Sequence, residues 1–144
     1  MKPIGHWLCR TDRALTATMD ALLADLGLTR LTWQVLNVLN VLDVLDGPAD
    51  DPEAGDTRVR AVLAANADAG ALTAAVEAVL AGGWAVRPQP GRLALTDAGR
   101  DRLAEAGARI GAFRELSTAG ISAEEYRTAV SVLERMTRNL ERAA

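Results

Sequence analysis

The chain has 144 residues, of which 49% are hydrophobic, and this is enough to form one compact domain rather than a disordered tail. Its single cysteine, Cys9, excludes an internal disulfide framework and a cysteine-rich metal site. The formal charge of -3 comes entirely from residues 46–95, which contain seven acidic residues and four arginines. A segment that binds nucleic acid normally has the opposite sign.

No secretory signal is expected, because Lys2, Pro3 and His6 are followed by Arg10 and Asp12 instead of a long apolar run. No stretch approaches the roughly 20 apolar residues that span a bilayer. Together with the single cysteine, these features predict a cytoplasmic protein that does not contact a membrane.

Apolar residues at three- and four-residue spacings predict a first helix over residues 3–26, with Gly27 as its C-cap. Thr29 or Thr32 is expected to cap a second helix that continues to residue 45. This second helix is apolar nearly all round, which predicts that it is the central, buried helix.

Residues 46–56 contain two prolines, two glycines and several acidic side chains, and are expected to form a solvated loop. A short helix over residues 57–66 should follow, capped by Asp56 or Thr57, and then a helix over residues 71–81. Two helices in this arrangement are typical of a helix-turn-helix, although the second helix contains no lysine or arginine.

Val86 and residues 93–95 predict two short strands, and residues 88–91, with two prolines and a glycine, turn the chain between them. Thr96 can cap a long helix over residues 97–116. A hairpin that continues into a capped helix is how a winged helix-turn-helix ends.

Ser122 and Glu125 form the sequence pattern of a capping box, which predicts a last helix that continues to residue 140. The first and last helices each carry a stripe of apolar residues. In so small a protein this indicates that the two ends pair with each other and with a second copy of the chain.

The order of these elements resembles that of the MarR family of bacterial transcription regulators over essentially the full length. The matching motifs are Gly27-Leu28-Thr29, Trp33-Gln34-Val35-Leu36, Gly83-Trp84-Ala85-Val86 and Leu95-Thr96-Asp97-Ala98-Gly99-Arg100. The resemblance implies a mainly α fold with a small β-hairpin wing. It also implies a homodimer held by the N- and C-terminal helices, a palindromic operator in double-stranded DNA, and a small-molecule pocket between the dimer helices and each lobe.

The resemblance further implies a single domain over residues 1–144. Residues 1–30 and 100–144 would form the dimerisation helices, residues 31–45 the central helix, and residues 46–99 the winged helix-turn-helix lobe, which includes the acidic loop 46–56.

Family members usually carry polar or basic side chains on the recognition helix, whereas this helix offers mostly alanine and glycine. We therefore expect few base contacts, and an affinity that is modest and steeply dependent on salt. The expected DNA contacts are Thr73 to a base, the wing residues Arg87, Gln89 and Arg92, and Arg58 and Arg60 to the backbone. The alternative is a lobe that keeps the fold but binds DNA poorly or not at all.

Trp33, Asn37 and Asn40 share one face of the second helix, and amides in a buried segment need partners. They either bond to the backbone or across the dimer, or they line a ligand pocket. In the second case the resemblance places further residues nearby, namely His6, Trp7, Arg10, Arg109 and Phe113. Two tryptophans with a few donors favour a planar, partly polar organic ligand, such as a small aromatic compound or a metabolite.

Neither a metal nor another cofactor is expected, because His6 is the sole histidine and zinc prefers several ligands. Cys9 invites comparison with the peroxide-sensing branch of the family, and neighbouring arginines favour its thiolate. It is displaced by about one helical turn from the reactive position of that branch, and the accompanying tyrosines are missing. An ordinary unreactive thiol is the preferred interpretation.

Three functions follow from these patterns. The preferred one is a dimeric repressor released from its operator by a small ligand, without enzymatic activity. The second is a repurposed ligand-binding or catalytic protein of the same fold. The sequence contains no recognisable pairing of a nucleophile with a base, which argues against catalysis. The third is a redox sensor that acts through Cys9.

Overall fold

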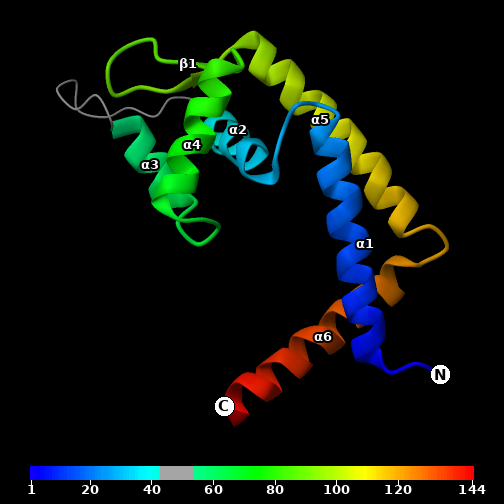
Figure 1. Cartoon of the computed structure of the whole chain (residues 1–144). Coiled ribbons are helices and arrows are strands. Elements are labelled where there is room, and N and C mark those ends of the chain that lie inside the picture. The colour runs from blue at the N-terminus through cyan, green and yellow to red at the C-terminus, as the bar shows by residue number, and fades with distance from the viewer. Residues whose placement is uncertain (43–53) are drawn as a thin grey trace. The chain divides into compact units, whose positions relative to one another are not determined.

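A computed structural model describes residues 1–42 and 54–144 of the chain (Figure 1). These ranges form six α-helices and one two-stranded antiparallel sheet, so the predicted fold class is confirmed. The described residues divide into two compact units, Met1–Ile110 and Gly111–Ala144, each of which is described by itself. The elements are α1 (Ile4–Ala24), α2 (Arg30–Leu42), α3 (Ala54–Val62), α4 (Ala69–Ala81), β1 (Ala85–Val86), β2 (Ala94–Leu95), α5 (Asp97–Ser117) and α6 (Ala123–Ala143).

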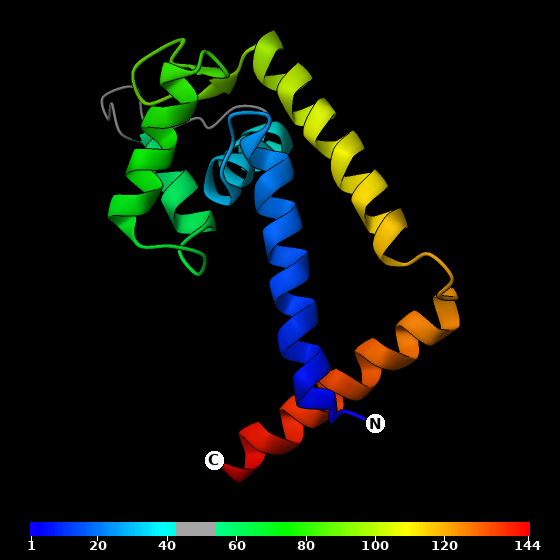
Figure 2. The same cartoon turned by 45° about the vertical axis from the view of Figure 1, so that its right-hand side comes forward.

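The core of the first unit is aliphatic. Helix α2 contacts α3, α4 and β2, and these elements gather where α1 leads into α2 (Figures 1 and 2). The largest fully buried side chains are Leu23, Leu26, Val35, Leu36, Val59, Leu72, Val76, Val79 and Leu93. Burial of leucine and valine from all these elements supplies the main stabilising free energy of the unit.

Helix α1 ends at Ala24, two residues before the predicted end, and its C-cap is Asp25 rather than the predicted Gly27. Gly27 belongs to the turn that follows the helix. Its φ of 73° is in the left-handed region, where a residue with a Cβ is strained. The Gly27 amide donates to the Ala24 carbonyl at 3.0 Å and the Leu28 amide to the Leu23 carbonyl at 2.9 Å. Leu23 and Leu28, which the second of these bonds joins, are both buried in the hydrophobic core.

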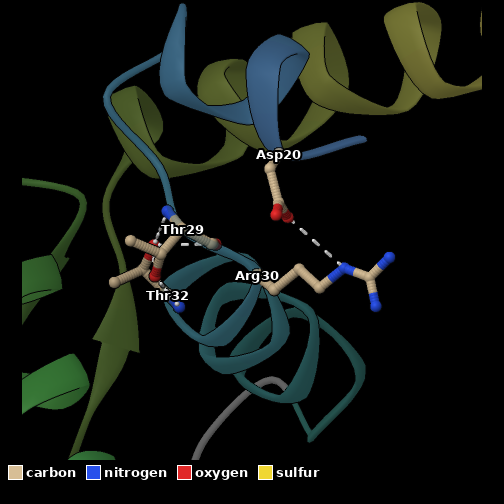
Figure 3. A network of polar contacts seen from close by, with 4 residues as sticks. All are labelled: Asp20, Thr29, Arg30 and Thr32. Carbon is tan, nitrogen blue, oxygen red and sulfur yellow. Dashed lines mark hydrogen bonds and ion pairs between the residues drawn. The ribbon is translucent and has the colours of Figure 1, made fainter. Parts of the chain in front are cut away.

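Thr29 is the residue that caps α2. Its Oγ1 accepts from the Thr32 amide at 3.1 Å, and its own amide donates to the Thr32 Oγ1 at 2.8 Å (Figure 3). Beside this cap, the Arg30 Nε lies 3.7 Å from the Asp20 Oδ1. Both side chains are more than half exposed, so this ion pair adds little to the stability of the α1–α2 junction.

Helix α2 is the central helix of the first unit, as predicted, but its described part is not buried on every side. Val35, Leu36 and Leu39 are buried, whereas Val41 is 78% exposed. The elements that α2 contacts leave the side of Val41 uncovered, and an all-apolar sequence does not indicate which side that is. The predicted residues 43–45 of this helix lie outside the described residues.

Helix α3 differs from its prediction in both bounds. It spans Ala54–Val62 instead of residues 57–66, so residues 54–56 are helical rather than part of a loop. Asp56 is buried in the first turn and bonds to Arg87, and it therefore does not cap the helix from outside. The remaining loop positions, residues 46–53, lie outside the described residues.

Helix α4 begins at Ala69, two residues before the predicted start. Asp68 is its N-cap, with Oδ1 accepting from the Ala71 amide at 2.8 Å. An aspartate at this position also interacts favourably with the positive end of the helix dipole. The carboxylate thus sits at the end of the helix where a DNA-binding protein would present donors to bases or phosphates.

The wing is short. Strands β1 and β2 pair with Ala85 opposite Leu95 and Val86 opposite Ala94. As predicted, Thr96 caps α5, since its Oγ1 accepts from the Gly99 amide at 3.0 Å. The same hydroxyl donates to the Gly83 carbonyl at 2.6 Å and so ties the start of α5 to the end of α4.

The second unit contains α6, and the predicted capping box is confirmed there. The Ser122 Oγ accepts from the Glu125 amide at 3.0 Å, and the Glu125 Oε1 accepts from the Ser122 amide at 3.0 Å. Hydrogen bonds to the Glu125 carboxylate from the backbone amide and then the side chain of Ser122 lower the pKa of Glu125 from its ordinary value of 4.5. The apolar stripe of α6 is exposed at Tyr126, Val130, Met136 and Leu140.

Candidate nucleic-acid interface and ligand-binding residues

The outer side of α4 is formed by small and acidic residues. The helix buries Leu72, Ala75, Val76 and Val79. The residues exposed to solvent are Ala69, Gly70, Ala71, Ala74, Glu77, Ala78 and Ala81. Glu77 is the sole ionisable side chain in the sequence of α4, so the surface that would meet a DNA duplex carries no positive charge of its own.

Arg60 of α3 contacts α4 through Thr73. Its Nη1 donates to the Thr73 Oγ1 at 3.3 Å, and its Nη2 donates to the Thr57 Oγ1 at 3.3 Å. Both Arg60 and Thr73 are half-buried at the packing surface between α3 and α4. Two predicted DNA contacts, one for the backbone and one for a base, are therefore in contact with each other.

Arg87 at the end of β1 forms a bidentate ion pair with Asp56 of α3. The Nη1–Oδ1 distance is 2.7 Å and the Nη2–Oδ2 distance is 2.9 Å. The Asp56 side chain is 11% exposed and that of Arg87 is 36% exposed. Such a pair is a strong charge-assisted contact that holds the wing to α3. Sequence reasoning placed Arg87 on DNA and did not find this partner.

The other predicted wing contacts lie in the turn that follows. Gln89 is exposed and Arg92 is half-buried. The Arg92 amide donates to the Gln89 carbonyl at 3.1 Å, which closes the turn. Arg58 is an exposed side chain of α3. The role of these residues on DNA stays a prediction.

Trp84 joins the end of α4, the wing and α5. Its amide donates to the Val79 carbonyl at 3.1 Å, and its carbonyl accepts from the Thr96 amide at 3.0 Å. The Arg102 guanidinium lies 5.6 Å from the centroid of the Trp84 ring, within the range of a cation–π contact.

The same Arg102 side chain donates to the Leu26 carbonyl at 3.1 Å and so reaches the end of α1. Sequence reasoning did not single out Arg102. The residues next to Arg102 in the sequence do not indicate its two contacts, because both partners are distant along the chain.

Three of the predicted ligand-binding residues come together at the start of α1. The His6 and Trp7 rings lie 5.2 Å apart in an edge-to-face arrangement, and the Arg10 guanidinium lies 5.8 Å from the Trp7 centroid. The His6 Nε2 is buried and has no hydrogen-bond partner among the residues that the structure describes. The cluster combines an aromatic face, a cation and a polar ring atom.

The predicted residues of α2 are placed differently. The Asn37 Nδ2 donates to the Trp33 carbonyl at 3.2 Å, so the alternative of a backbone partner is confirmed for Asn37. Asn40 is exposed, and the expectation that it lies in a buried segment is wrong because that side of α2 is uncovered.

Two of the predicted ligand residues belong to α5. The Arg109 side chain lies 3.2 Å from the Glu105 Oε1 and 3.8 Å from the Asp25 Oδ2. It is thus engaged by carboxylates of α5 and of the segment after α1. Phe113 belongs to the second unit, where it is half-buried.

Cys9 is exposed and forms no disulfide. In residues 1–42 and 54–144, no three His, Cys, Asp or Glu side chains are grouped so that they could hold a metal ion. Within the same ranges no helix is long and apolar enough to cross a membrane. A redox role for Cys9 stays a prediction.

Comparison with known proteins gives a match in fold. No protein-family model matches the sequence, and no curated protein matches it. A MarR family protein of Mycobacterium tuberculosis solved in complex with DNA superposes with a TM-score of 0.69 at 23% identity, over 94% of this chain and 98% of the other. The same protein in complex with salicylic acid gives a TM-score of 0.58 at 23% identity, over 94% and 99% of the two chains.

A mutant MarR of E. coli in complex with operator DNA gives a TM-score of 0.67 at 20% identity, over 93% of both chains. At these identities the comparison concerns the fold, and it spans both units of the chain. The protein therefore has the winged helix-turn-helix fold of the MarR type.

Proposed function

We propose that the protein is a MarR-type transcription regulator that binds duplex DNA as a homodimer and responds to a small organic ligand. The observation that carries the proposal is the likeness, over 94% of the chain, to a MarR family protein solved with DNA. The outer side of α4 is exposed at Ala69, Gly70 and Ala74, and is open to a duplex. The proposed operator is a palindrome, because two identical lobes related by a two-fold axis match two identical half-sites.

The regulator would act as a repressor that the ligand releases. A ligand that binds better to the form unable to engage both half-sites shifts the population away from DNA. In this proposal the protein is not an enzyme. The likeness in fold to MarR family proteins supports this.

The proposed ligand is a planar aromatic compound that carries a polar or acidic group. The complex of a MarR family protein with salicylic acid supports this class. In this chain Trp7 offers a ring for stacking, and Arg10, whose guanidinium lies 5.8 Å from the Trp7 centroid, offers a cation for a carboxylate. His6 adds a buried ring nitrogen, Nε2, that has no hydrogen-bond partner among the described residues.

A second candidate function is a ligand-binding protein of the same fold with little affinity for DNA. One observation favours it, namely that Asp56 neutralises the wing residue Arg87 through two hydrogen bonds of 2.7 and 2.9 Å. The sequence of α4 contributes Glu77 and no cation. A protein that had lost selection for DNA binding would tolerate both features.

One experiment separates the two functions. Binding of the purified protein to the intergenic duplex upstream of its own gene is titrated from low to physiological salt, with a scrambled duplex of the same composition as control. Preference for the upstream duplex, with an affinity that falls as salt rises, supports the regulator. Lack of affinity for either duplex at low salt, combined with quenching of tryptophan fluorescence by salicylate, supports the ligand-binding protein.

A further inference from the structure

The structure brings a positive charge to α4 from the neighbouring helix α3. The guanidinium of Arg60 bonds to Thr73, 13 positions later in the chain, at 3.3 Å, although α4 itself contains no lysine or arginine. A second bond of 3.3 Å to Thr57 fixes the other end of the guanidinium. Two attachments of a planar group determine its orientation, so Arg60 is held in one place relative to α4.

The direction of the Arg60–Thr73 bond follows from the chemistry of arginine. A guanidinium stays protonated and has five N–H donors but no acceptor. The Thr73 Oγ1 must therefore accept, and one of its lone pairs is occupied by Arg60. The hydroxyl proton of Thr73 remains available to donate to another acceptor.

Thr73 lies at the edge of the exposed side of α4. It is half-buried, and its exposed neighbours are Gly70, which has no side chain, and Ala74, which has a small one, so both allow close approach. In the major groove of DNA a hydroxyl donor finds acceptors on purine N7, guanine O6 and thymine O4. The residues that precede and follow Thr73 on this side of α4 offer no competing donor from a side chain.

We propose that Arg60 and Thr73 act as one recognition unit, in which Arg60 is a positioning residue and Thr73 donates to an acceptor on a base edge. Arg60 fixes the side chain of Thr73 and directs its hydroxyl proton away from α3. The guanidinium also supplies the positive charge that α4 lacks. This assignment rests on the proposed function, because it names the group that distinguishes one operator sequence from another.

The test is a double-mutant cycle read out on sequence discrimination. The variants are Thr73→Val, Arg60→Met and the double variant, with Thr73→Ser and Arg60→Lys as conservative replacements. Kd is measured by fluorescence anisotropy on the upstream duplex and on duplexes that change one base pair at a time. Arg58→Met is the matched control, since Arg58 is an exposed arginine of the same helix. Thermal unfolding of each variant shows that it is folded at the temperature of measurement.

We expect Thr73→Val to lose about 2- to 10-fold discrimination at one base pair of each half-site, the range for a single hydrogen bond. Arg60→Met should lose discrimination at the same base pair, and the double variant should lose no more than either single variant. Thr73→Ser should retain discrimination, whereas Arg60→Lys should keep overall affinity better than discrimination, because lysine lacks the planar fork. Arg58→Met should weaken binding to all duplexes alike.

Additive losses in the double variant would overturn the proposal. It would also be overturned if Arg60→Met weakened all duplexes equally, since Arg60 would then be a phosphate contact only. If the unaltered protein binds no duplex, the proposed function itself fails and this assignment fails with it. If the wild type binds its upstream duplex and both single variants keep full discrimination, the Arg60–Thr73 assignment is wrong. The proposed function is then unaffected.

Discussion

At the scale of single residues, Gly99 shows how one position determines the approach of two elements. A Cβ built on Gly99 would overlap the carbonyl oxygen of Trp84, which is backbone and has no flexible end that moves aside. The same Trp84 carbonyl accepts from the Thr96 amide at 3.0 Å. The first turn of α5 therefore lies against the wing only because residue 99 lacks a side chain.

We expect Gly99→Ala to lower the free energy of unfolding by about 1–3 kcal/mol, since the overlap forces α5 away from Trp84. Gly107→Ala is the control, because a Cβ there meets nothing within 4 Å and the position is helical. That control should raise stability by about 0.4–1 kcal/mol. Urea unfolding followed by circular dichroism measures both. Equal stability of Gly99→Ala and the wild type would show that the contact is not required.

At the scale of elements, the wing is attached to α3 through an ion pair that the sequence pattern did not predict. Asp56 has the position of a helix cap in the sequence, but the structure buries it beneath Arg87, 31 residues later in the chain. Helix α3 begins at Ala54, so Asp56 lies within its first turn. Asp56 thus forms an ion pair through tertiary packing instead of the helix cap that the local sequence predicted.

We expect Arg87→Met to lower the free energy of unfolding by about 1–2 kcal/mol, because it leaves a nearly buried carboxylate without its cation. This loss of stability is smaller than for a fully buried ion pair, because the Arg87 side chain is 36% exposed. The double variant Asp56→Asn with Arg87→Met should lose less than the sum of the two single variants. Urea denaturation of the three variants gives the coupling. Strictly additive values would mean that the pair contributes nothing to stability.

The start of α6 allows a prediction for pH. Hydrogen bonds to Ser122 lower the folded-state pKa of Glu125 from 4.5, so the capping box stabilises α6 above that pH. The contribution should decrease as the pH falls through the lowered pKa, where the carboxylate becomes protonated. Glu125→Gln can retain the hydrogen bond from the Ser122 amide but does not titrate there.

The measurement for α6 is the thermal midpoint followed by circular dichroism from neutral to acid pH. The thermal midpoint of the wild type should fall further than that of Glu125→Gln between neutral and acid pH. Glu124→Gln removes a neighbouring carboxylate in the first turn of α6 and serves as control. An identical acid response in wild type and Glu125→Gln would contradict the role of the capping box.

At the scale of the whole molecule, each terminal helix exposes apolar side chains. Trp7 and Leu15 of α1 are 50% and 40% exposed, and Val130 and Leu140 of α6 are 48% and 71% exposed. Apolar surface of this kind is typical of an interface with another protein. The dimer inferred for the regulator would bury it.

We expect the wild type to have twice the mass of the chain in light scattering after size-exclusion chromatography. Val130→Glu should shift the mass towards the monomer at micromolar concentration, because a carboxylate buried in an apolar interface is unfavourable. Ser131→Glu is the control, since the next position of the helix lies outside the apolar stripe. A monomeric wild type, or equal masses for both variants, would contradict this interface.

The sequence by itself determined the features that depend on neighbouring residues. The N-cap at Thr96 and the capping box of Ser122 and Glu125 were predicted correctly, because each consists of hydrogen bonds between residues three positions apart. The apolar spacing likewise predicted which segments are helical. These features were sufficient to recognise the order of elements of a winged helix-turn-helix.

Only the tertiary structure decided which polar groups meet. Asp56 with Arg87, Arg60 with Thr73, and Arg102 with Leu26 are separated by 31, 13 and 76 positions. No local pattern encodes such partners, because they depend on how α3, α4, α5 and the wing pack. For the same reason the uncovered side of α2 and the start of α3 differed from prediction. Packing also determines the charge beside α4, because the cation that bonds to this helix, Arg60, belongs to α3.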